Sequence, residues 1–129
     1  MFLNLAQIGQ IAFAVSDVER SEAFYRDVLR LRKLFRFSDL TFFDCAGVRP
    51  MLEKAHDGNV CGIGVPYYRR PDITVAVAEL EGRGVRFSSQ WRLIARMDDH
   101  DLWMSLFTDP DGHQHALMHE APKGWALPN

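Results

Sequence analysis

The stretch Ile8-Gly-Gln-Ile-Ala-Phe-Ala-Val-Ser-Asp-Val-Glu19 decides the fold, because it changes from a strand pattern to a helix pattern within a few residues. Bulky side chains recur at every second position, and this period of two predicts a strand over residues 8–15. The other face of that strand begins at Gln10 and is small and partly polar, which suits the wall of a cavity. Asp17 is a favoured N-cap residue, and apolar residues at helical spacing then predict a helix to about Leu31.

Three short strands are expected after this helix, and they complete a first module: Leu34–Phe37, Leu40–Cys45 and Val48–Lys54. Ala46-Gly47 supplies the turn between the last two strands. Pro50 lies inside the third of them and has no N–H to donate, which predicts an edge or bulge position there. A bulge would reverse the faces on which the neighbouring side chains lie.

After a polar connection over residues 55–59 the pattern begins again. A strand is expected over Ile63–Arg69, and Asp72 is then placed to cap a helix over Ile73–Glu81. Further extended segments are expected at residues 85–88, 92–97, 102–108 and 115–119. The sequence Asp109-Pro-Asp-Gly112 fits a type I turn, with Asp, Pro and Gly at the positions that favour them.

The repeat predicts an α+β fold of two βαβββ modules, over residues of about 6–56 and 61–121, whose paired mixed sheets form a central cleft. Together they are expected to make a single domain over residues 1–129. A doubly wound parallel sheet would need more helices than the two that the pattern predicts, each of which is followed by short strands. A ferredoxin-like α+β sandwich is the alternative fold.

Composition and charge narrow the range of functions. Apolar residues make up 47% of the chain and charged residues 25%, as in globular proteins, and the net charge of −2 argues against a nucleic-acid partner. No apolar run is long enough to span a membrane and no signal peptide is recognisable, so a cytoplasmic location is expected. Cys45 and Cys61 lie in no metal-binding or C-x-x-C spacing and are expected to be reduced thiols.

Four segments resemble the vicinal oxygen chelate superfamily, which includes glyoxalases, bleomycin-resistance proteins and extradiol dioxygenases. They are the opening stretch over residues 8–19 with Ala23–Leu29, then Phe43–Arg49, then Asp72–Val85, and finally Leu102–Gly112 with Leu117-Met118. Each motif is moderately specific by itself. Their order along nearly the whole chain makes the resemblance strong.

The resemblance implies a cupped cleft, commonly completed in a homodimer, in which enzyme members hold a divalent metal that acts as a Lewis acid. Non-enzymatic members use the cleft to sequester a drug. The four metal-ligand positions of the superfamily fall here on Gln10, Met51, Val65 and Ala116. Because a hard cation needs oxygen or imidazole ligands, the metal site is expected to be absent.

Strand alternation extends this set to Arg49, Tyr67 and Arg69, and Trp103 and Met118 complete the candidate cleft lining. An arginine there is suited to a substrate carboxylate or phosphate. Trp103, Phe35 and Trp91 are the aromatic candidates for the wall, and core packing accounts for them equally well.

Two residues are candidate acids or bases: Glu53, which would otherwise form an ion pair with Arg49, and His100, in a polar loop. His113, His115 and His119 cluster in the sequence. By the resemblance His115 and His119 face away from the cleft, so helix packing or surface exposure is expected rather than a zinc site.

These observations favour a cytoplasmic homodimer that binds a small organic molecule in an apolar cleft without a metal cofactor. Its role would be sequestration, or metal-free acid–base chemistry such as an isomerisation or cyclisation, so whether it is an enzyme is left open. One alternative is a divalent-metal-dependent lyase, isomerase or dioxygenase that uses Gln10, Glu53 and a histidine. The other is a non-catalytic dimerisation module with a filled cleft.

Overall fold

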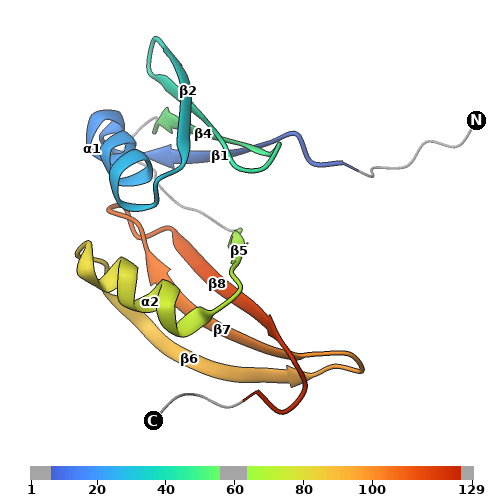
Figure 1. Cartoon of the computed structure of the whole chain (residues 1–129). Helices are drawn as coiled ribbons and strands as arrows, with labels where there is room; N and C mark the ends of the chain where they lie inside the picture. The colour runs from blue at the N-terminus through green and yellow to red at the C-terminus, as the bar shows by residue number, and fades with distance from the viewer. Residues whose placement is uncertain (1–6, 56–63, 126–129) are drawn as a thin grey trace, which may run out of the picture. The chain divides into compact units, whose positions relative to one another are not determined.

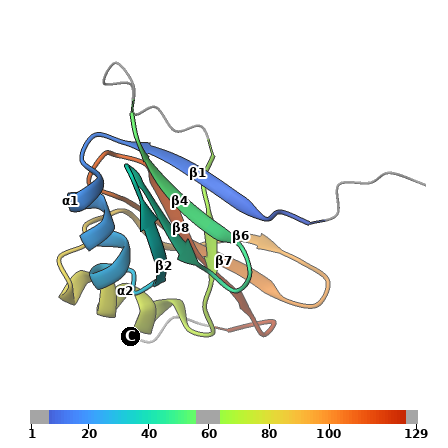
Figure 2. The same cartoon turned by 90° about the horizontal axis from the view of Figure 1, so that it is seen from above.

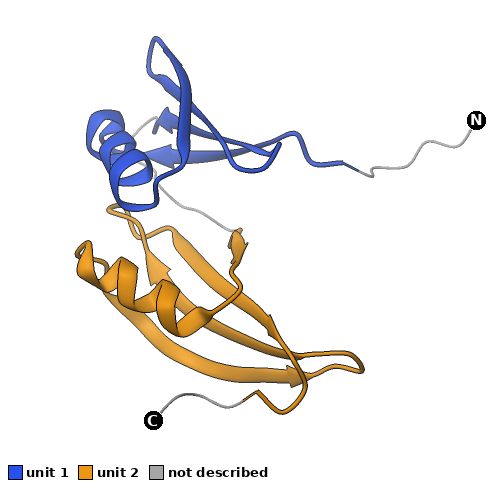
Figure 3. Ribbon diagram, viewed as in Figure 1, with its two compact units in different colours: residues 1–62 blue, residues 63–129 orange. Residues whose placement is uncertain are grey.

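The computed structural model describes residues 7–55 and 64–125. The chain divides into two compact units, residues 1–62 and residues 63–129 (Figure 3). Each unit contains a strand, a helical segment and three further strands, and these strands form one four-stranded mixed sheet. The two βαβββ modules and the α+β class are therefore confirmed. Within the described ranges no helix is long and apolar enough to cross a membrane.

The first unit consists of β1 (Gln10–Val15), α1 (Val18–Ala23), the π-helical turn η1 (Phe24–Val28), β2 (Arg32–Phe37), β3 (Leu40–Asp44) and β4 (Arg49–Lys54). Its strands lie in the order β1-β4-β3-β2, with β1 and β4 parallel and the other neighbours antiparallel. Figure 2 shows β1 and β4 running side by side. A parallel pair needs a crossover, which the helical segment and the β2–β3 hairpin provide.

The first helix begins as the sequence predicts and ends earlier. The carboxylate of Asp17 accepts a hydrogen bond from the backbone N–H of Arg20 at 3.0 Å, which caps α1. The helical turns end at Val28 rather than Leu31, since Arg30 adopts a positive φ of 59° that a right-handed helix cannot continue. The last turn is π-helical, which the apolar spacing did not indicate.

The core of the first unit lies between the helical segment and one face of the sheet. Its buried members are Phe13, Val15, Val18, Tyr25, Phe43 and Leu52. The ring of Tyr25 packs at 5.8 Å from that of Phe13 and 6.0 Å from that of Phe43. Every second residue of β1 and β4 therefore faces α1 and η1, and the residues between them lie on the face of the sheet opposite the helix.

Pro50 occupies neither an edge nor a bulge, so that prediction is wrong. β4 lies between β1 and β3, and its pairing with β1 runs from Gln10 opposite Arg49 to Val15 opposite Lys54 without a register shift. The pairing of β3 with β4 begins only at Met51. The proline nitrogen thus falls just outside that ladder, where no donor is required.

The second unit consists of β5 (Tyr67–Arg69), α2 (Ile73–Gly82), β6 (Phe87–Arg96), β7 (Asp101–Thr108) and β8 (Gln114–Ala121). The strand order is β5-β8-β7-β6, which repeats the pattern of the first unit, and α2 lies over one face of this sheet (Figure 1). Asp72 caps α2, and Gly112 closes the turn before β8 by donating from its N–H to the carbonyl of Asp109 at 3.0 Å.

Two of the expected strand boundaries in this unit need correction. The extended segments at residues 85–88 and 92–97 are one strand, β6, whose pairing with β7 shifts register at three places. Half-buried and exposed residues alternate along the whole of β6, but the polar run Ser88-Ser89-Gln90 concealed this continuity in the sequence. β5 covers only Tyr67–Arg69, and the expected beginning of that strand at Ile63, like Cys61, lies outside the described residues.

Candidate functional site

The face of the first sheet opposite α1 collects four of the residues singled out in the sequence. In the β1–β4 register Gln10 lies opposite Arg49, Ala12 opposite Met51, and Ala14 opposite Glu53. Because β4 contains no bulge, Arg49, Met51 and Glu53 share one face, as strand alternation predicts. We refer to this side of the sheet, which also includes Leu40 and Phe42 of β3 and Phe35 and Phe37 of β2, as the open face.

Arg49 is held on the open face by two neighbours. Its Nε donates to the side-chain oxygen of Gln10 at 3.2 Å, and its Cζ lies 5.6 Å from the centroid of the Phe42 ring. The amide nitrogen of Gln10 lies 3.5 Å from the sulfur of Met51. Gln10 therefore directs its oxygen to a cation that the chain itself provides, and the guanidinium lies over an aromatic face that favours positive charge.

Aromatic side chains extend this surface across β3 and β2. The rings of Phe35 and Phe42 stack with centroids 4.5 Å apart, and Phe35 and Phe37 are 46% and 69% exposed. Sequence reasoning considered Phe35 and missed Phe42. A signal was present, because Phe42 and Phe43 are adjacent in a strand and only one of them can enter the core. The buried one is Phe43.

Glu53 is separated from Arg49, which contradicts the ion-pair interpretation. Four residues along a strand span about 13 Å. Within the described part of the chain no salt bridge joins the two side chains, and Glu53 lies beside Ala14 and Leu40 instead. Glu53 is half-buried as a residue, and its two ladder partners are apolar, so its carboxylate is available to accept a hydrogen bond from a ligand.

In the second unit Tyr67 and Arg69 lie beside Ala116 and Met118 on the face of the sheet opposite α2. Val65 precedes β5 and is 39% exposed. Arg69 forms an ion pair with Glu120 at 2.5 Å. The predicted cleft between the two modules remains a prediction.

Glu120, which the sequence did not single out, links His100 to Arg69. The Nε2 of His100 lies 3.4 Å from the second carboxylate oxygen of Glu120, and its Nδ1 lies 2.7 Å from Asp99. Glu120 follows Ala116 and Met118 at two-residue spacing, so alternation would have placed it beside them. Glu120 thus joins two predicted residues that lie far apart in the sequence.

Trp103 lies on the opposite side of this sheet from Ala116 and Met118, so its assignment to the same wall is wrong. It pairs with His119 across the β7–β8 ladder, while Met104 pairs with Met118. Its ring packs edge-on against Trp125 at 5.5 Å. Both faces of β7 carry large apolar residues, so the sequence of that strand alone does not show which face is turned toward α2.

The late histidines pack under α2, as expected. His119 accepts a hydrogen bond from the backbone N–H of Ile73 at 3.4 Å, and the Nδ1 of His115 lies 2.9 Å from the hydroxyl of Tyr68. The ring of His115 also stacks on Phe107. Burial lowers the pKa of His115 to about 4, so its ring is neutral at physiological pH.

The residues at the superfamily's metal positions do not fit a divalent ion. The oxygen of Gln10 already accepts from a guanidinium, and the second position presents the thioether of Met51. Val65 and Ala116 have no donor atoms at all. Across residues 7–55 and 64–125 no three His, Cys, Asp or Glu side chains gather as metal ligands do.

Burial raises the pKa of the Cys45 thiol, which is the opposite of what a nucleophile requires.

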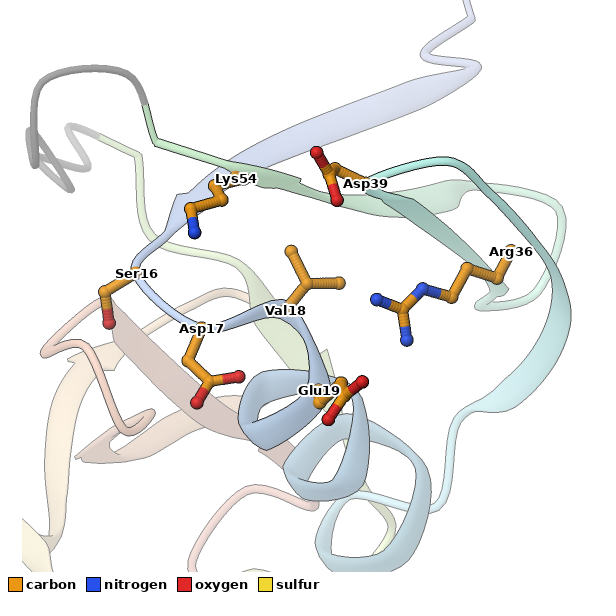
Figure 4. A pocket seen from close by; sticks show the side chains of 7 residues that line it. All are labelled: Ser16, Asp17, Val18, Glu19, Arg36, Asp39 and Lys54. Carbon is orange, nitrogen blue, oxygen red and sulfur yellow. The ribbon is translucent and has the colours of Figure 1, made fainter.

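A pocket of about 340 Å³ lies at the start of α1, between that helix, β2 and the end of β4 (Figure 4). Charged side chains of both signs surround it, and Val18 forms its apolar base. None of the predicted site residues lines it. Arg36 enters this pocket from the face of β2 that is turned toward α1, so it is separated from Arg49 by the sheet.

The sequence is similar to a known protein family and to a named relative. The sequence model of the family described as Glyoxalase/Bleomycin resistance protein/Dioxygenase superfamily matches residues 7–117. Metallothiol transferase FosB from Lysinibacillus sphaericus (strain C3-41) is 28% identical over 116 residues, which cover 87% of this chain and 81% of FosB.

Solved structures with this fold include two that illustrate the likeness. A member of the same superfamily from Sphaerobacter thermophilus DSM 20745 is 25% identical with a TM-score of 0.73, over 90% of this chain and 98% of that one. TnmS3, an antibiotic binding protein from Streptomyces sp. CB03234, is 18% identical with a TM-score of 0.70, over 95% of this chain and 100% of its own. At that identity the likeness to TnmS3 concerns the fold alone.

Proposed function

The chain belongs to the Glyoxalase/Bleomycin resistance protein/Dioxygenase superfamily, and on that basis we propose that it binds a small organic molecule on the open face without a divalent metal. The observation that carries this proposal is the contact between Arg49 and Gln10. The position that would ligate a metal through oxygen instead accepts from a side chain with a permanent positive charge. A divalent cation placed there would be repelled by the guanidinium.

The composition of the open face supports a small-molecule ligand. Apolar and aromatic groups predominate, and two charged groups, Arg49 and Glu53, lie at separate places on it. A mainly apolar surface with a few fixed polar groups is typical of sites for small organic molecules. The antibiotic-binding description of TnmS3 is compatible with such a role for this fold.

We favour sequestration over catalysis as the role of this binding. Glu53 has the geometry of an acceptor on the open face, and His100 is engaged with Asp99 and Glu120 in the other unit. Acid–base turnover would require a ligand proton within reach of one of these groups. A metal-dependent reaction is the second candidate, which the name of the FosB relative favours and the residues at the four positions disfavour.

The test combines metal analysis with a ligand screen. Protein purified without chelators should contain far less than one metal ion per chain, on the order of 0.1 or below, as adventitious binding would give. Inductively coupled plasma mass spectrometry measures this metal content. Aromatic compounds should raise the melting temperature by mass action. Ala12→Arg would place a long charged side chain on the open face and should abolish those shifts. Ala78→Arg, at an exposed position of α2, is the matched control and should preserve them.

Two results would refute the proposal. One is stoichiometric metal that is lost in Gln10→Ala. The other is a set of ligands whose binding Ala12→Arg leaves intact, since these would bind elsewhere on the chain. Turnover assays on any ligand that passes the test then separate sequestration from catalysis.

A further inference from the structure

Arg49 has no acidic partner among the described residues, although acidic side chains are frequent in the first unit. The nearest acidic residue on the same strand face is Glu53, about 13 Å along β4. Asp44, which the register of the β3–β4 hairpin places opposite Arg49, instead pairs with Arg32 at 3.8 Å and accepts from the backbone N–H of Gly47 at 3.2 Å. The contact with Gln10 uses only the Nε of Arg49, so within residues 7–55 and 64–125 both terminal nitrogens of the guanidinium have no protein acceptor.

The two contacts of Arg49 also fix how those terminal nitrogens are presented. Gln10 anchors the Nε side of the group, and the Phe42 ring lies at 5.6 Å from Cζ. An anchored guanidinium loses less conformational freedom when it binds an anion. Its planar fork matches a carboxylate, which accepts two parallel N–H hydrogen bonds.

The surroundings of the guanidinium indicate what the rest of the ligand is. Phe42 stacks on Phe35 at 4.5 Å, and Met51 lies beside Phe42 across the β3–β4 pair. Aromatic rings and a thioether are favourable neighbours for another flat ring. A ring attached to a carboxylate would therefore lie on these side chains while its carboxylate reaches Arg49.

We propose that the ligand of the open face is an aromatic carboxylic acid, bound through its carboxylate to Arg49 and through its ring to Phe35, Phe42 and Met51. This inference rests on the proposed function and specifies its ligand. A monoanion is favoured over a phosphate ester, because the other cation that the register places on this face, Arg32, already pairs with Asp44 at 3.8 Å. A dianion would require more than one positive charge.

The test uses three probes in isothermal titration calorimetry: 2-naphthoate, its neutral amide 2-naphthamide, and 2-naphthyl phosphate. The unmodified protein should bind naphthoate most tightly. Arg49→Gln should weaken naphthoate binding about tenfold to a hundredfold, as expected for the loss of charge-assisted hydrogen bonds, and should leave naphthamide within about twofold. Arg49→Lys keeps the charge without the fork and should give an intermediate loss.

Arg36→Gln is the matched control, because it removes the same charge from β2, which β3 separates from β4, on the side of the sheet turned toward α1. It should leave naphthoate affinity unchanged, and the melting temperature of each variant reports whether it folds. The inference is overturned if Arg49→Gln binds naphthoate as tightly as the unmodified protein, or if Arg36→Gln loses as much affinity. Tighter binding of the phosphate would overturn the choice of a carboxylate.

The same titrations separate the two proposals. If naphthamide and naphthoate bind equally and Ala12→Arg abolishes both, the proposed function stands and the carboxylate inference fails. If none of the three probes binds at millimolar concentration, the carboxylate inference fails. The proposed function then also fails unless the ligand screen yields a compound that Ala12→Arg displaces.

Discussion

Gln10 and Arg49 lie opposite each other on the parallel strands β1 and β4, and the Nε of Arg49 donates to the oxygen of Gln10 over 3.2 Å. An arginine guanidinium carries a permanent positive charge. The amide of Gln10 therefore serves as a support for a fixed positive charge. Substitution of Gln10 should therefore change the affinity for an anionic ligand, without disturbing the core on the other side of the sheet.

Gln10→Glu should weaken the binding of 2-naphthoate at least tenfold. The new carboxylate is nearly the same size as the amide and would pair with Arg49, so it competes with the carboxylate of the ligand. Gln10→Ala removes the anchor and keeps the charge free, and it should cost only about twofold to fivefold in affinity. Calorimetric titration of both variants measures the difference. Tighter naphthoate binding by Gln10→Glu would contradict the role assigned to Arg49.

Trp103→Phe should leave the affinity for 2-naphthoate within about twofold and change the free energy of unfolding by no more than about 1 kcal/mol. The indole N–H of Trp103 is buried with no hydrogen-bond partner among the described residues. The loss of packing against Trp125 is thus offset by removal of an unsatisfied donor. Urea unfolding and calorimetry provide the two readouts. A large loss of naphthoate affinity would restore Trp103 as a wall of the ligand site.

The error at Trp103 shows where sequence reasoning reaches its limit. Alternation correctly grouped Gln10, Arg49, Met51 and Glu53, because in β1 one face is bulky and the other is small, and the core must take the bulky one. In β7 both faces are apolar. The choice between them depends on the register with β8, a long-range pairing that the local pattern does not contain.

Side-chain contacts between strands could not be predicted from the sequence either, because they also depend on long-range strand register. The position of Phe42 beneath Arg49 and the link from Arg69 through Glu120 to His100 each join residues from different strands or loops. Side-chain periodicity assigns a face to each residue but not a neighbour. The motifs nevertheless predicted the order of the elements, since capping residues such as Asp17 and Asp72 act locally.

Asp72→Ala should lower the free energy of unfolding by about 1 kcal/mol, the usual cost of losing an N-cap. Its carboxylate accepts hydrogen bonds from the backbone N–H of Thr74 at 2.9 Å and from the Thr74 hydroxyl at 2.7 Å. The hydroxyl bond is the main reason why the pKa of Asp72 is lowered. The contribution is therefore present above the pKa of the unfolded carboxyl and is lost as the pH falls through the folded pKa.

Chemical denaturation at pH 7 measures this difference, and Asp98→Ala in an exposed loop is the control for removal of an acidic side chain. The control should change the unfolding free energy by less than about 0.5 kcal/mol. Equal effects of the two variants would show that Asp72 stabilises the protein only through its charge and not as a cap.

The protein should lose stability as the pH falls from 6.5 toward 4, and His115 should account for a large part of the loss. Its ring is fully buried, stacks on Phe107 at 5.3 Å, and lies within hydrogen-bonding distance of Tyr68. Burial lowers its pKa to about 4, whereas an exposed histidine titrates near 6.5. Between these values the unfolded chain takes up a proton that the folded chain refuses, so protonation favours unfolding.

The contribution of the neutral His115 ring to the free energy of unfolding is complete above pH 6.5 and disappears as the pH falls toward 4. Its maximum size is about 3 kcal/mol. Urea unfolding at half-unit intervals from pH 7.5 to 4.5 measures the slope. The double variant His115→Phe with Tyr68→Phe removes the titrating ring and leaves no unpaired hydroxyl behind. Asp109 and His113, whose charges also act on His115, are retained in both proteins. The double variant should therefore show a shallower slope, and an unchanged slope would assign the acid sensitivity to other groups.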